Sequence, residues 1–328
     1  MSSAAPRPAL SVVICTLDRP DLVRQAVQSL TTQTLPASRF EVVVVDNGSG
    51  GTVAAALTDL HEQLGDLRVV EEPVLGLSQA RNRGTREAVG DVVLFLDDDA
   101  EGEPELLERH LERFEGPTPA AATGGRILLR WPDERPAWVP TSQEGYYSAL
   151  DLGPQTLAMV FPVYPYGANM AIRRDLLVEL GGFSLELGRV GTNLISGEEK
   201  DLFARIAAGG GRVDYVPGAV VHHHVLPDRT RPRWLLRRAW AQGRSEIAMR
   251  RLTEQPLGAL KTGLRAGLNL SRGLRLGARW AVAVATRQDA AVGMERASGA
   301  LRSLGAAYEG GADGWRLRPG RRPRPEAR

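Results

Sequence analysis

Residues 10–97 alternate apolar runs with amphipathic segments, and this alternation constrains the fold more than any other feature. The runs at 10–16, 41–45 and 92–96 are almost entirely apolar and rich in β-branched residues, which is typical of strands buried on both faces. Helical patterns follow the runs, and the first opens at Pro20, a favoured residue at a helix start. The alternation predicts an α/β fold class with a mostly parallel central sheet flanked by helices.

Weaker patterns extend this domain beyond residue 115. The predicted elements are strands at 121–130, 170–172, 213–216 and 219–225 and helices at 173–180 and 198–208. Residues 131–165 are rich in Pro, Trp and Tyr and are expected to form long loops.

The net charge of +2 hides a strong asymmetry. Residues 1–224 carry 19 basic and 31 acidic side chains, whereas residues 225–328 carry 22 basic and 8 acidic ones. Such a change along a chain indicates separate domains. The expected organisation is a disordered N-terminus (1–8), an α/β domain (9–228), a basic helical extension (229–310) and an Arg/Pro-rich disordered tail (311–328).

The cysteine content and the lack of long apolar segments exclude several classes of protein. Cys15 is the only cysteine, so the chain has no intramolecular disulfide and no cysteine-based zinc cluster. No segment has the length and apolar character of a signal peptide or a membrane span. These features predict a cytoplasmic protein.

Polar residues follow the predicted strands at the places where the strands end. Thr16, Asp18 and Arg19 stand at the end of the run 10–16, and Asp46 follows the run 41–45. Residues 97–99 form three consecutive aspartates directly after the run 92–96. Ligands bind at the carboxyl ends of parallel strands, so these side chains are expected to meet there. Alternation directs Asp97 and Asp99 to one side and Asp98 to the other, which suits Mg²⁺ or Mn²⁺ with a diphosphate. The alternative is a solvated acidic turn or a cap for a helix starting near Pro104.

A segment bounded by glycines, residues 76–84, opens the helix that precedes the strand at 92–96. In this segment Arg81 could hold a phosphate and Asn82 could hydrogen-bond to a nucleotide. The alternative is an ordinary capped helix with arginines on its surface.

Taken together, these motifs resemble the family 2 glycosyltransferases. The resemblance rests on SVVICTLDRP (11–20), VVVDNGS (43–49), GLSQARNRG (76–84), FLDDD (95–99), GANMAIRR (167–174), GGF (181–183) and GEEKDL (197–202). It spans roughly residues 9–245, and the order and spacing of the motifs make it specific. The resemblance implies the nucleotide-sugar-binding GT-A fold, an inverting reaction and a divalent cation, Mn²⁺ or Mg²⁺.

The resemblance also implies roles for the matching residues. Thr16 and Asp46 are expected to hold the nucleoside, Asp97 to contact the ribose and Asp99 to ligate the metal. The whole nucleotide-sugar-binding set is Thr16, Asp18, Arg19, Asp46, Arg81, Asn82, Asp97 and Asp98, and Asn169 and Glu198 are expected on the acceptor or donor-sugar side.

The family's general base occupies the second carboxylate of a Glu-Asp-x-Asp pattern, which corresponds to Glu199 in this sequence. The chain departs from that pattern because it carries Glu in place of Asp, and Asp201 is the next candidate. Ser196 and Glu199 also have the spacing of a capping box, so Glu199 could instead close the helix N-terminus. Both interpretations remain open at this point.

Three consecutive histidines, residues 222–224, end the last predicted strand. Alternation places His222 and His224 on the side opposite His223. Similar sequences carry a histidine at the position of His223, which favours His223 as a residue at or near the metal. The expected site is of the Mg/Mn type, rich in oxygen ligands and with one imidazole, rather than a structural zinc site.

The basic C-terminal part contains helical patterns from 232 to 252 and from 257 to 304. The first mixes Trp234, Leu235 and Trp240 with several arginines, as an amphipathic helix does. Two interpretations stay open: the helices pack on the catalytic domain, or they lie on an anionic membrane, in which case the protein is peripheral at its inner face. No nucleic-acid-binding motif is recognised and only 5% of residues are aromatic, so no nucleic-acid partner is expected.

The sequence therefore predicts a metal-dependent inverting glycosyltransferase that uses a nucleotide-diphosphate sugar, with a UDP-sugar preferred. The acceptor would be a hydroxyl of a glycan, a lipid-linked sugar or a small secondary metabolite. Two alternatives remain, a nucleotidyltransferase on a similar α/β domain and a catalytically inactive membrane-associated binding protein. Neither the sugar nor the acceptor follows from these motifs.

Overall fold

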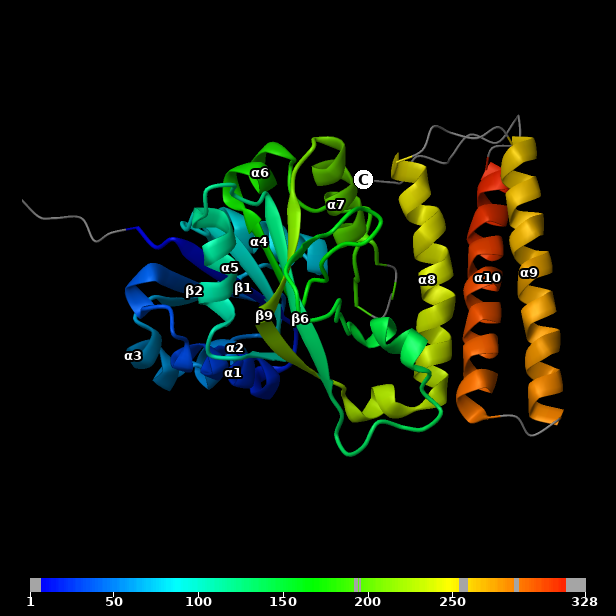
Figure 1. Cartoon of the computed structure of the whole chain (residues 1–328), viewed down its shortest axis with the longest axis horizontal. Coiled ribbons are helices and arrows are strands. Elements are labelled where there is room, and N and C mark those ends of the chain that lie inside the picture. Colours follow the sequence, from blue (N-terminus) through cyan, green and yellow to red (C-terminus); the bar gives the residue numbers. More distant parts are fainter. Residues whose placement is uncertain (1–6, 192–193, 195, 254–258, 286–288, 317–328) are drawn as a thin grey trace, which may run out of the picture. The chain divides into compact units, whose positions relative to one another are not determined.

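A computed structural model of the chain describes residues 7–191, 194, 196–253, 259–285 and 289–316 (Figure 1). The chain forms two compact units. The first comprises residues 1–132, 147–192 and 198–225, and the second comprises residues 133–146, 193–197 and 226–328. Of the two ends predicted to be disordered, residues 1–6 and 317–328 lie outside the described residues, and residues 311–316 belong to a helix.

Four parallel strands form the N-terminal half of the sheet in the first unit. They are β1 (Leu10–Thr16), β2 (Phe40–Asp46), β3 (Leu67–Glu71) and β4 (Val92–Asp97), in the order β3-β2-β1-β4. Cys15 of β1 pairs with both Val45 and Asp97, so the polar ends of the strands share one edge of the sheet. This register confirms the predicted strands and the expected meeting of their carboxyl ends.

The sheet continues through strands of mixed direction. They are β5 (Ala100–Gly102), β6 (Ala122–Arg130), β7 (Leu157–Ala158), β8 (Asn169–Arg173) and β9 (Val213–His224). Strand β8 is antiparallel to β4 and β6, and β9 is parallel to β6 and antiparallel to the short strands β5 and β7. The parallel ladders are the longer ones, so the sheet is mostly parallel, as predicted.

Two local predictions for the sheet differ from the structure. The strands predicted at 213–216 and 219–225 are one strand, β9, whose register with β6 shifts opposite Gly125 and Arg126. Pro217 and Gly218 lie at this irregularity, where a missing N–H donor and a missing side chain are tolerated. The sequence also gave no sign of β5, which follows the three aspartates directly and pairs with β9.

Helices cover both faces of the sheet. The helices of the first unit are α1 (Pro20–Ser29), α2 (Thr52–Ala56), α3 (His61–Leu64), α4 (Leu77–Glu87), α5 (Leu106–Glu115), α6 (Arg174–Glu179) and α7 (Glu198–Ala208). Successive strand residues belong to opposite clusters: Val12 packs with Val23 of α1 and Leu107 of α5, whereas Val13 packs with Ala80 of α4 and Leu202 of α7. This is the doubly covered sheet that continuous apolar strands require.

The second unit contains α8 (Pro232–Thr253), α9 (Ala259–Ala285) and α10 (Ala290–Arg316), and α10 packs against both other helices (Figure 1). The glycines of this region, which weaken a helix prediction, allow close approach. A Cβ atom on Gly243 of α8 would lie 1.8 Å from the Arg302 carbonyl oxygen, and one on Gly305 of α10 would lie 2.2 Å from that of Trp240. Among the described residues, no helix combines the length and the apolar character needed to cross a bilayer.

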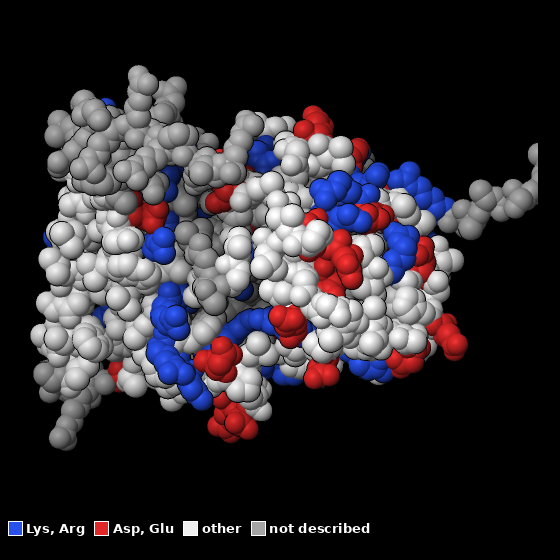
Figure 2. Space-filling view, turned by 180° about the vertical axis from the view of Figure 1, so that it is seen from behind, with Lys and Arg blue, Asp and Glu red and all other residues white. Residues whose placement is uncertain are grey.

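Many acidic side chains of the first unit pair with arginines. Asp214, for example, lies 2.7 Å from Arg113, and Asp59 lies 2.5 Å from Arg24. In Figure 2, red acidic and blue basic side chains lie beside one another over this unit. The excess of acidic residues in residues 1–224 is therefore partly neutralised on the surface.

Candidate active site

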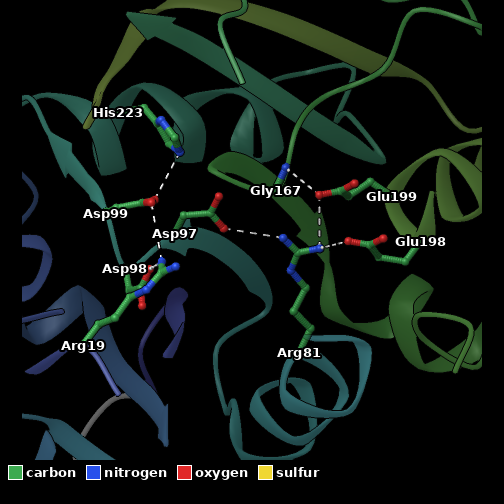
Figure 3. Close-up of polar contacts among 9 residues, drawn as sticks. All are labelled: Arg19, Arg81, Asp97, Asp98, Asp99, Gly167, Glu198, Glu199 and His223. Atoms are coloured by element: carbon green, nitrogen blue, oxygen red, sulfur yellow. Dashed lines mark hydrogen bonds and ion pairs between the residues drawn. The ribbon is translucent and has the colours of Figure 1, made fainter. Parts of the chain in front are cut away.

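Asp97, Asp99 and His223 come together at the carboxyl edge of the parallel strands. Each offers one ligand atom, and the three atoms lie within 4.8 Å of one another. Strand β9 brings His223 opposite Ala100, and its Nε2 lies 3.1 Å from Asp99 Oδ1 (Figure 3). The main-chain N–H of His224 donates to the Asp99 carbonyl oxygen at 2.8 Å, which fixes this approach.

This group of side chains suits a divalent cation. Carboxylate oxygens with a single imidazole are a donor set for Mn²⁺ and Mg²⁺. The Nδ1 atom of His223 is buried and has no hydrogen-bond partner within the described part of the chain. A buried imidazole that is held mainly through Asp99 can serve as a ligand without first breaking other hydrogen bonds.

Asp98 points away from that group, as alternation predicted. Its Oδ2 accepts a 2.7 Å hydrogen bond from Thr16 Oγ1, and its Oδ1 lies 3.2 Å from Arg19 Nη1. Burial, aided by the negative charge of Asp99, raises the pKa of Asp98 to about 6, and Arg19 and Thr16 oppose the rise. The same Arg19 nitrogen lies 3.6 Å from Asp99 Oδ2, so the guanidinium bridges the two carboxylates.

Asp46 is the last residue of β2, and Asp18 lies in the loop that follows β1. Asp46 is buried, and its Oδ1 accepts hydrogen bonds from the N–H groups of Gly48 and Ser49 at 3.2 and 2.7 Å. Asp18 is exposed and adopts a positive φ of 54°, and its N–H donates to Ser49 Oγ at 2.8 Å. These hydrogen bonds tie the two loops together at the strand ends.

Arg81 of α4 is almost completely buried, with 2% of its surface exposed. Its Nη1 lies 3.0 Å from Glu198 Oε1 and 3.2 Å from Glu199 Oε1, and its Nη2 lies 3.5 Å from Asp97 Oδ1 (Figure 3). The nearby carboxylates, Glu199 most of all, raise the pKa of Arg81 despite its burial. The sequence placed Arg81 at a phosphate, whereas the structure surrounds it with three carboxylates.

Glu199 is the second residue of α7 and points toward Arg81 rather than closing its own helix. Its Oε1 accepts a hydrogen bond from the Gly167 N–H at 3.2 Å. In a capping box Glu199 would instead accept from the Ser196 N–H, which donates to Ser245 Oγ at 3.0 Å. Of the two interpretations that the sequence left open, the structure favours a site residue.

Glu198 is the first residue of α7 and is almost fully buried. Burial, together with the charge of Glu199, raises the pKa of Glu198. Its 3.0 Å contact with Arg81 makes it a partner of that guanidinium. The sequence placed Glu198 on the acceptor or donor-sugar side.

Two other candidates are engaged elsewhere. Asp201 pairs with Arg205 at 2.8 Å, one turn further along α7, and Arg205 also donates to the carbonyl oxygens of Leu180 and Gly182. The Asn82 amide donates to the Phe183 carbonyl oxygen and accepts from the Phe183 N–H, so it stabilises a turn. The contacts of both residues are those of structural supports.

Asn169 is fully buried, and its expected place beside the acceptor or donor sugar stays a prediction. Its Nδ2 donates to the carbonyl oxygens of Arg126 and Ala219, and its Oδ1 lies 2.8 Å from His110 Nε2. The side chain joins β6, β8 and β9 beneath the site. In this structure its amide is therefore engaged by hydrogen bonds within the sheet.

His222 and His224 lie on the side opposite His223, as predicted. His222 Nε2 is 3.0 Å from Glu103 Oε1, and His224 Nε2 is 2.5 Å from Glu101 Oε1. These contacts leave His223 as the histidine of the run that faces Asp99.

Gly167 has a role that residue type alone did not reveal. A Cβ atom at this position would lie 1.9 Å from Arg81 Nη2 and 2.6 Å from Glu199 Oε1. Glycine is therefore required for Arg81 and Glu199 to meet beneath the main chain. In the sequence, Gly167 was noticeable only as the first residue of the motif GANMAIRR (167–174), which resembles a motif of the family.

The fold and the carboxylate-lined sheet edge define a glycosyltransferase with a GT-A-type domain. Residues 11–181 match the family described as Glycosyl transferase family 2, and the chain belongs to that family. The family resemblance, the fold class and the enzyme class predicted from the sequence are thus confirmed.

Two similar proteins match across most of both chains. The glucosyl-dolichyl phosphate glucuronosyltransferase of Haloferax volcanii is 29% identical over 249 residues, which are 73% of this chain and 77% of the relative. The succinoglycan biosynthesis protein ExoM of Rhizobium meliloti is 29% identical over 239 residues, 72% and 73% of the two chains.

A solved structure with a similar fold is the mannosyltransferase PcManGT from Pyrobaculum calidifontis, in complex with GDP-Man and Mn²⁺. It superposes with a TM-score of 0.56 at 24% identity, covering 76% of this chain and 66% of that one. The likeness establishes the fold.

Proposed function

We propose that this protein is a metal-dependent, inverting glycosyltransferase that takes its sugar from a nucleotide diphosphate, with a UDP-sugar as the preferred donor. The observation that carries the proposal is the convergence of Asp97, Asp99 and His223 within 4.8 Å at the carboxyl edge of a parallel sheet. Glu199 lies in the same neighbourhood, connected to Asp97 through Arg81. The site therefore combines candidate metal ligands with a candidate base.

Asp99 and His223 would hold the divalent cation, Mn²⁺ or Mg²⁺, and the geometry adds Asp97 to them. When bound, the cation supplies Lewis-acid stabilisation of the negative charge on the leaving diphosphate. Asp97 was expected at the ribose, and its distance from Asp99 and His223 supports a ligand role in addition.

The nucleoside would bind at the ends of β1 and β2. Thr16 and Asp98 are joined by a hydrogen bond, and Arg19 lies against Asp98 and Asp99. Asp46 is held through Oδ1 by the loop that follows it. These contacts orient polar groups before the donor arrives, which lowers the entropy cost of binding.

Glu199 would act as the general base that removes the proton from the acceptor hydroxyl. Its Oε1 is anchored by Arg81 and by the Gly167 N–H, so the carboxylate is held in one orientation. A single base and attack from the face opposite the leaving group give inversion at the anomeric carbon. The 2.8 Å pairing of Asp201 with Arg205 favours Glu199 over Asp201 for this role.

The acceptor would be a hydroxyl of a glycan, a lipid-linked sugar or a small metabolite. The names of the two relatives, one concerning a dolichyl phosphate sugar and the other succinoglycan, support a glycan or lipid-linked acceptor. Family membership and the Asp97-Asp99-His223 group favour this activity over a nucleotidyltransferase and over an inactive binding protein. We include in the proposal a cytoplasmic location with contact to the inner face of an anionic membrane, where a lipid-linked acceptor would be found.

Thermal unfolding with a panel of UDP-, dTDP- and GDP-sugars, each with and without Mn²⁺, tests the proposal. One of the sugars, a UDP-sugar by preference, should raise the melting temperature in the presence of Mn²⁺ and much less without it. Mass spectrometry of the product from a glycan or lipid-linked acceptor then identifies the transfer. The proposal fails if no nucleotide sugar shifts the transition in metal.

A further inference from the structure

Helix α9 differs from its neighbours in what it exposes. Of the large apolar side chains that are exposed on the described part of the second unit, most belong to α9: Leu264, Leu268, Leu270, Leu274, Trp280, Val282 and Val284. By contrast, α8 turns its apolar face inward, and Leu235 and Ala239 are fully buried. The apolar surface available for a partner is therefore on α9.

Several of the exposed apolar residues of α9, among them Leu264, Leu268 and Val282, share one side of the helix. Leu264 and Leu268 are one turn apart and are 65% and 60% exposed, and Leu274 is 62% exposed. The opposite face packs on α10: a Cβ atom on Gly273 would lie 2.8 Å from the Leu304 side chain, and Ala283 is buried. Because the helix is fixed on α10 through this inner face, its leucines point outward.

A basic flank borders this apolar face. Lys261, Arg265, Arg272 and Arg279 are spaced four and seven residues apart, so they share one side of the helix. Together with Arg275 they are the charged residues of the segment 259–285, which contains no Asp or Glu. An apolar face beside cations of a single sign matches an interfacial helix on anionic lipid.

A pocket at one end of this surface has the chemistry of a phosphate site. It has a volume of about 240 Å³ and is lined by Arg250 of α8 and by Arg265, Leu268 and Asn269 of α9. Two guanidinium groups and an amide can bind phosphate oxygens, while Leu268 belongs to the apolar face. Polar recognition and apolar burial thus occur side by side, as they do at the headgroup level of a bilayer.

The charge on α9 distinguishes a membrane from a second copy of the chain. Pairing of two α9 helices would bring cations of like sign together without an acidic partner on that helix. An anionic bilayer offers opposite charge and an apolar layer along the whole helix, which is about 40 Å long for 27 residues at the usual rise per residue.

We propose that the outer face of α9 docks on an anionic phospholipid bilayer and that the pocket between Arg250 and Arg265 receives a lipid phosphate. A membrane contact was part of the proposed function. The present proposal names the surface that makes this contact and the lipid group that it binds. It does not depend on glycosyl transfer.

Vesicle co-sedimentation tests the proposal with the full chain. Vesicles of phosphatidylcholine and phosphatidylglycerol should bind the protein at low salt, binding should weaken as salt rises, and pure phosphatidylcholine should bind little. Leu264→Glu and Leu268→Glu should each weaken binding at least about tenfold, since each removes a leucine that the bilayer would bury. Arg265→Gln and Arg272→Gln should each weaken it about fivefold.

Matched variants on the first unit provide the controls. Val178→Glu on α6 changes a residue that is 61% exposed, and Arg109→Gln changes a surface arginine of α5. Both should bind vesicles as the unchanged protein does. Circular dichroism and the Mn²⁺-dependent shift by a nucleotide sugar should be retained in the α9 variants, which separates this proposal from the proposed enzyme activity.

Four outcomes would overturn the docking surface. One is equal binding to both kinds of vesicle, and another is vesicle binding that the α9 variants leave intact. The third is a concentration-dependent dimer that Leu268→Glu abolishes, which would make a second copy the partner. Inorganic phosphate should displace the protein from vesicles no better than chloride of equal ionic strength. The fourth outcome is saturable binding of inorganic phosphate in the pocket without any vesicle binding, which would make a soluble anion the ligand instead of a bilayer.

Discussion

Arg81 and Glu199 form an ion pair of 3.2 Å between Nη1 and Oε1, although Arg81 is almost completely buried. Through its other contacts the same guanidinium reaches Glu198 and Asp97. One buried cation therefore connects the proposed base at the start of α7 with a proposed metal ligand at the end of β4. The relative positions of base and metal depend on this arginine.

Replacing Arg81 should be costly for stability. Arg81→Met leaves Glu198 buried without its cation, and such a loss lowers the free energy of unfolding by about 3–5 kcal/mol. Arg83→Met is the matched control, because Arg83 lies on the same helix and pairs with Glu87 at its surface. That pair contributes less than about 1 kcal/mol. Urea denaturation measures both, and equal effects would contradict the buried role of Arg81.

Glu199→Gln should retain donor binding and lose transfer by a factor of about 10²–10⁴, the usual contribution of a general base. Asp201→Asn should keep most of the transfer rate and lower the melting temperature, because Asp201 anchors Arg205. Transfer rates and nucleotide-sugar thermal shifts separate the two effects. A Glu199→Gln enzyme with nearly full activity would move the base elsewhere.

Asp99→Asn and His223→Ala should weaken the Mn²⁺ dependence of nucleotide-sugar binding. His222→Ala is the control, since the neighbouring side chain contacts Glu103 on the other side of the strand. Titration of Mn²⁺ at a fixed concentration of UDP-sugar measures the apparent metal affinity. If all three variants keep the affinity of the unchanged protein, the metal lies at another site.

Gly167→Ala should reduce transfer more than it reduces stability. The added methyl group would lie 1.9 Å from Arg81 Nη2 and must displace the Arg81–Glu199 pair. Gly209→Ala is the control, because its added methyl group would make ordinary contacts at 3.5 and 3.6 Å. A lower kcat for Gly167→Ala with little change in the KM for the donor would confirm the positioning of the base. Identical kinetics for both variants would refute it.

His110 should make the stability depend on pH. Burial lowers the pKa of His110 to about 4, and the ring lies 2.7 Å from Thr123 Oγ1 and 2.8 Å from Asn169 Oδ1. The folded state keeps the ring neutral, so the unfolded state takes up the extra proton. The free energy of unfolding should therefore be highest above about pH 6.5 and fall toward pH 4, by up to about 1.4 kcal/mol per pH unit.

The histidine responsible can be identified with a matched pair of variants. His110→Gln should lower stability at neutral pH and flatten the dependence between pH 6.5 and 4. His61→Gln, at an exposed position, should leave the dependence unchanged. Urea denaturation at several pH values measures both, and an unchanged slope in His110→Gln would show that other groups cause it.

Much of the site could be predicted because it follows strand ends. A run such as 92–96 predicts a buried strand, and the aspartates after it must then lie at the carboxyl edge. Alternation correctly separated Asp98 from Asp97 and Asp99, and His223 from its two neighbours. These are local consequences of extended backbone and needed no knowledge of the partners.

The sequence could not show those contacts whose two residues are distant in the chain. Arg81 and Asn169 were assigned to ligands on residue type and motif alone, yet packing surrounds Arg81 with carboxylates and buries Asn169 against His110. In the second unit the sequence indicated amphipathic helices but not which of them exposes its apolar residues. The structure buries Leu235 of α8 and exposes Leu264 of α9.

The sequence by itself determined the α/β class, the parallel strands and the carboxylates at their ends, because apolar periodicity and turn residues act over short stretches of chain. Only the tertiary structure decided that His223 joins Asp97 and Asp99, that Arg81 holds Glu199, and that α9 turns its leucines outward. Each of these depends on contacts between residues far apart in the chain. Hydrophobic burial and ion pairing stabilise such contacts only when the whole fold has brought the two residues together.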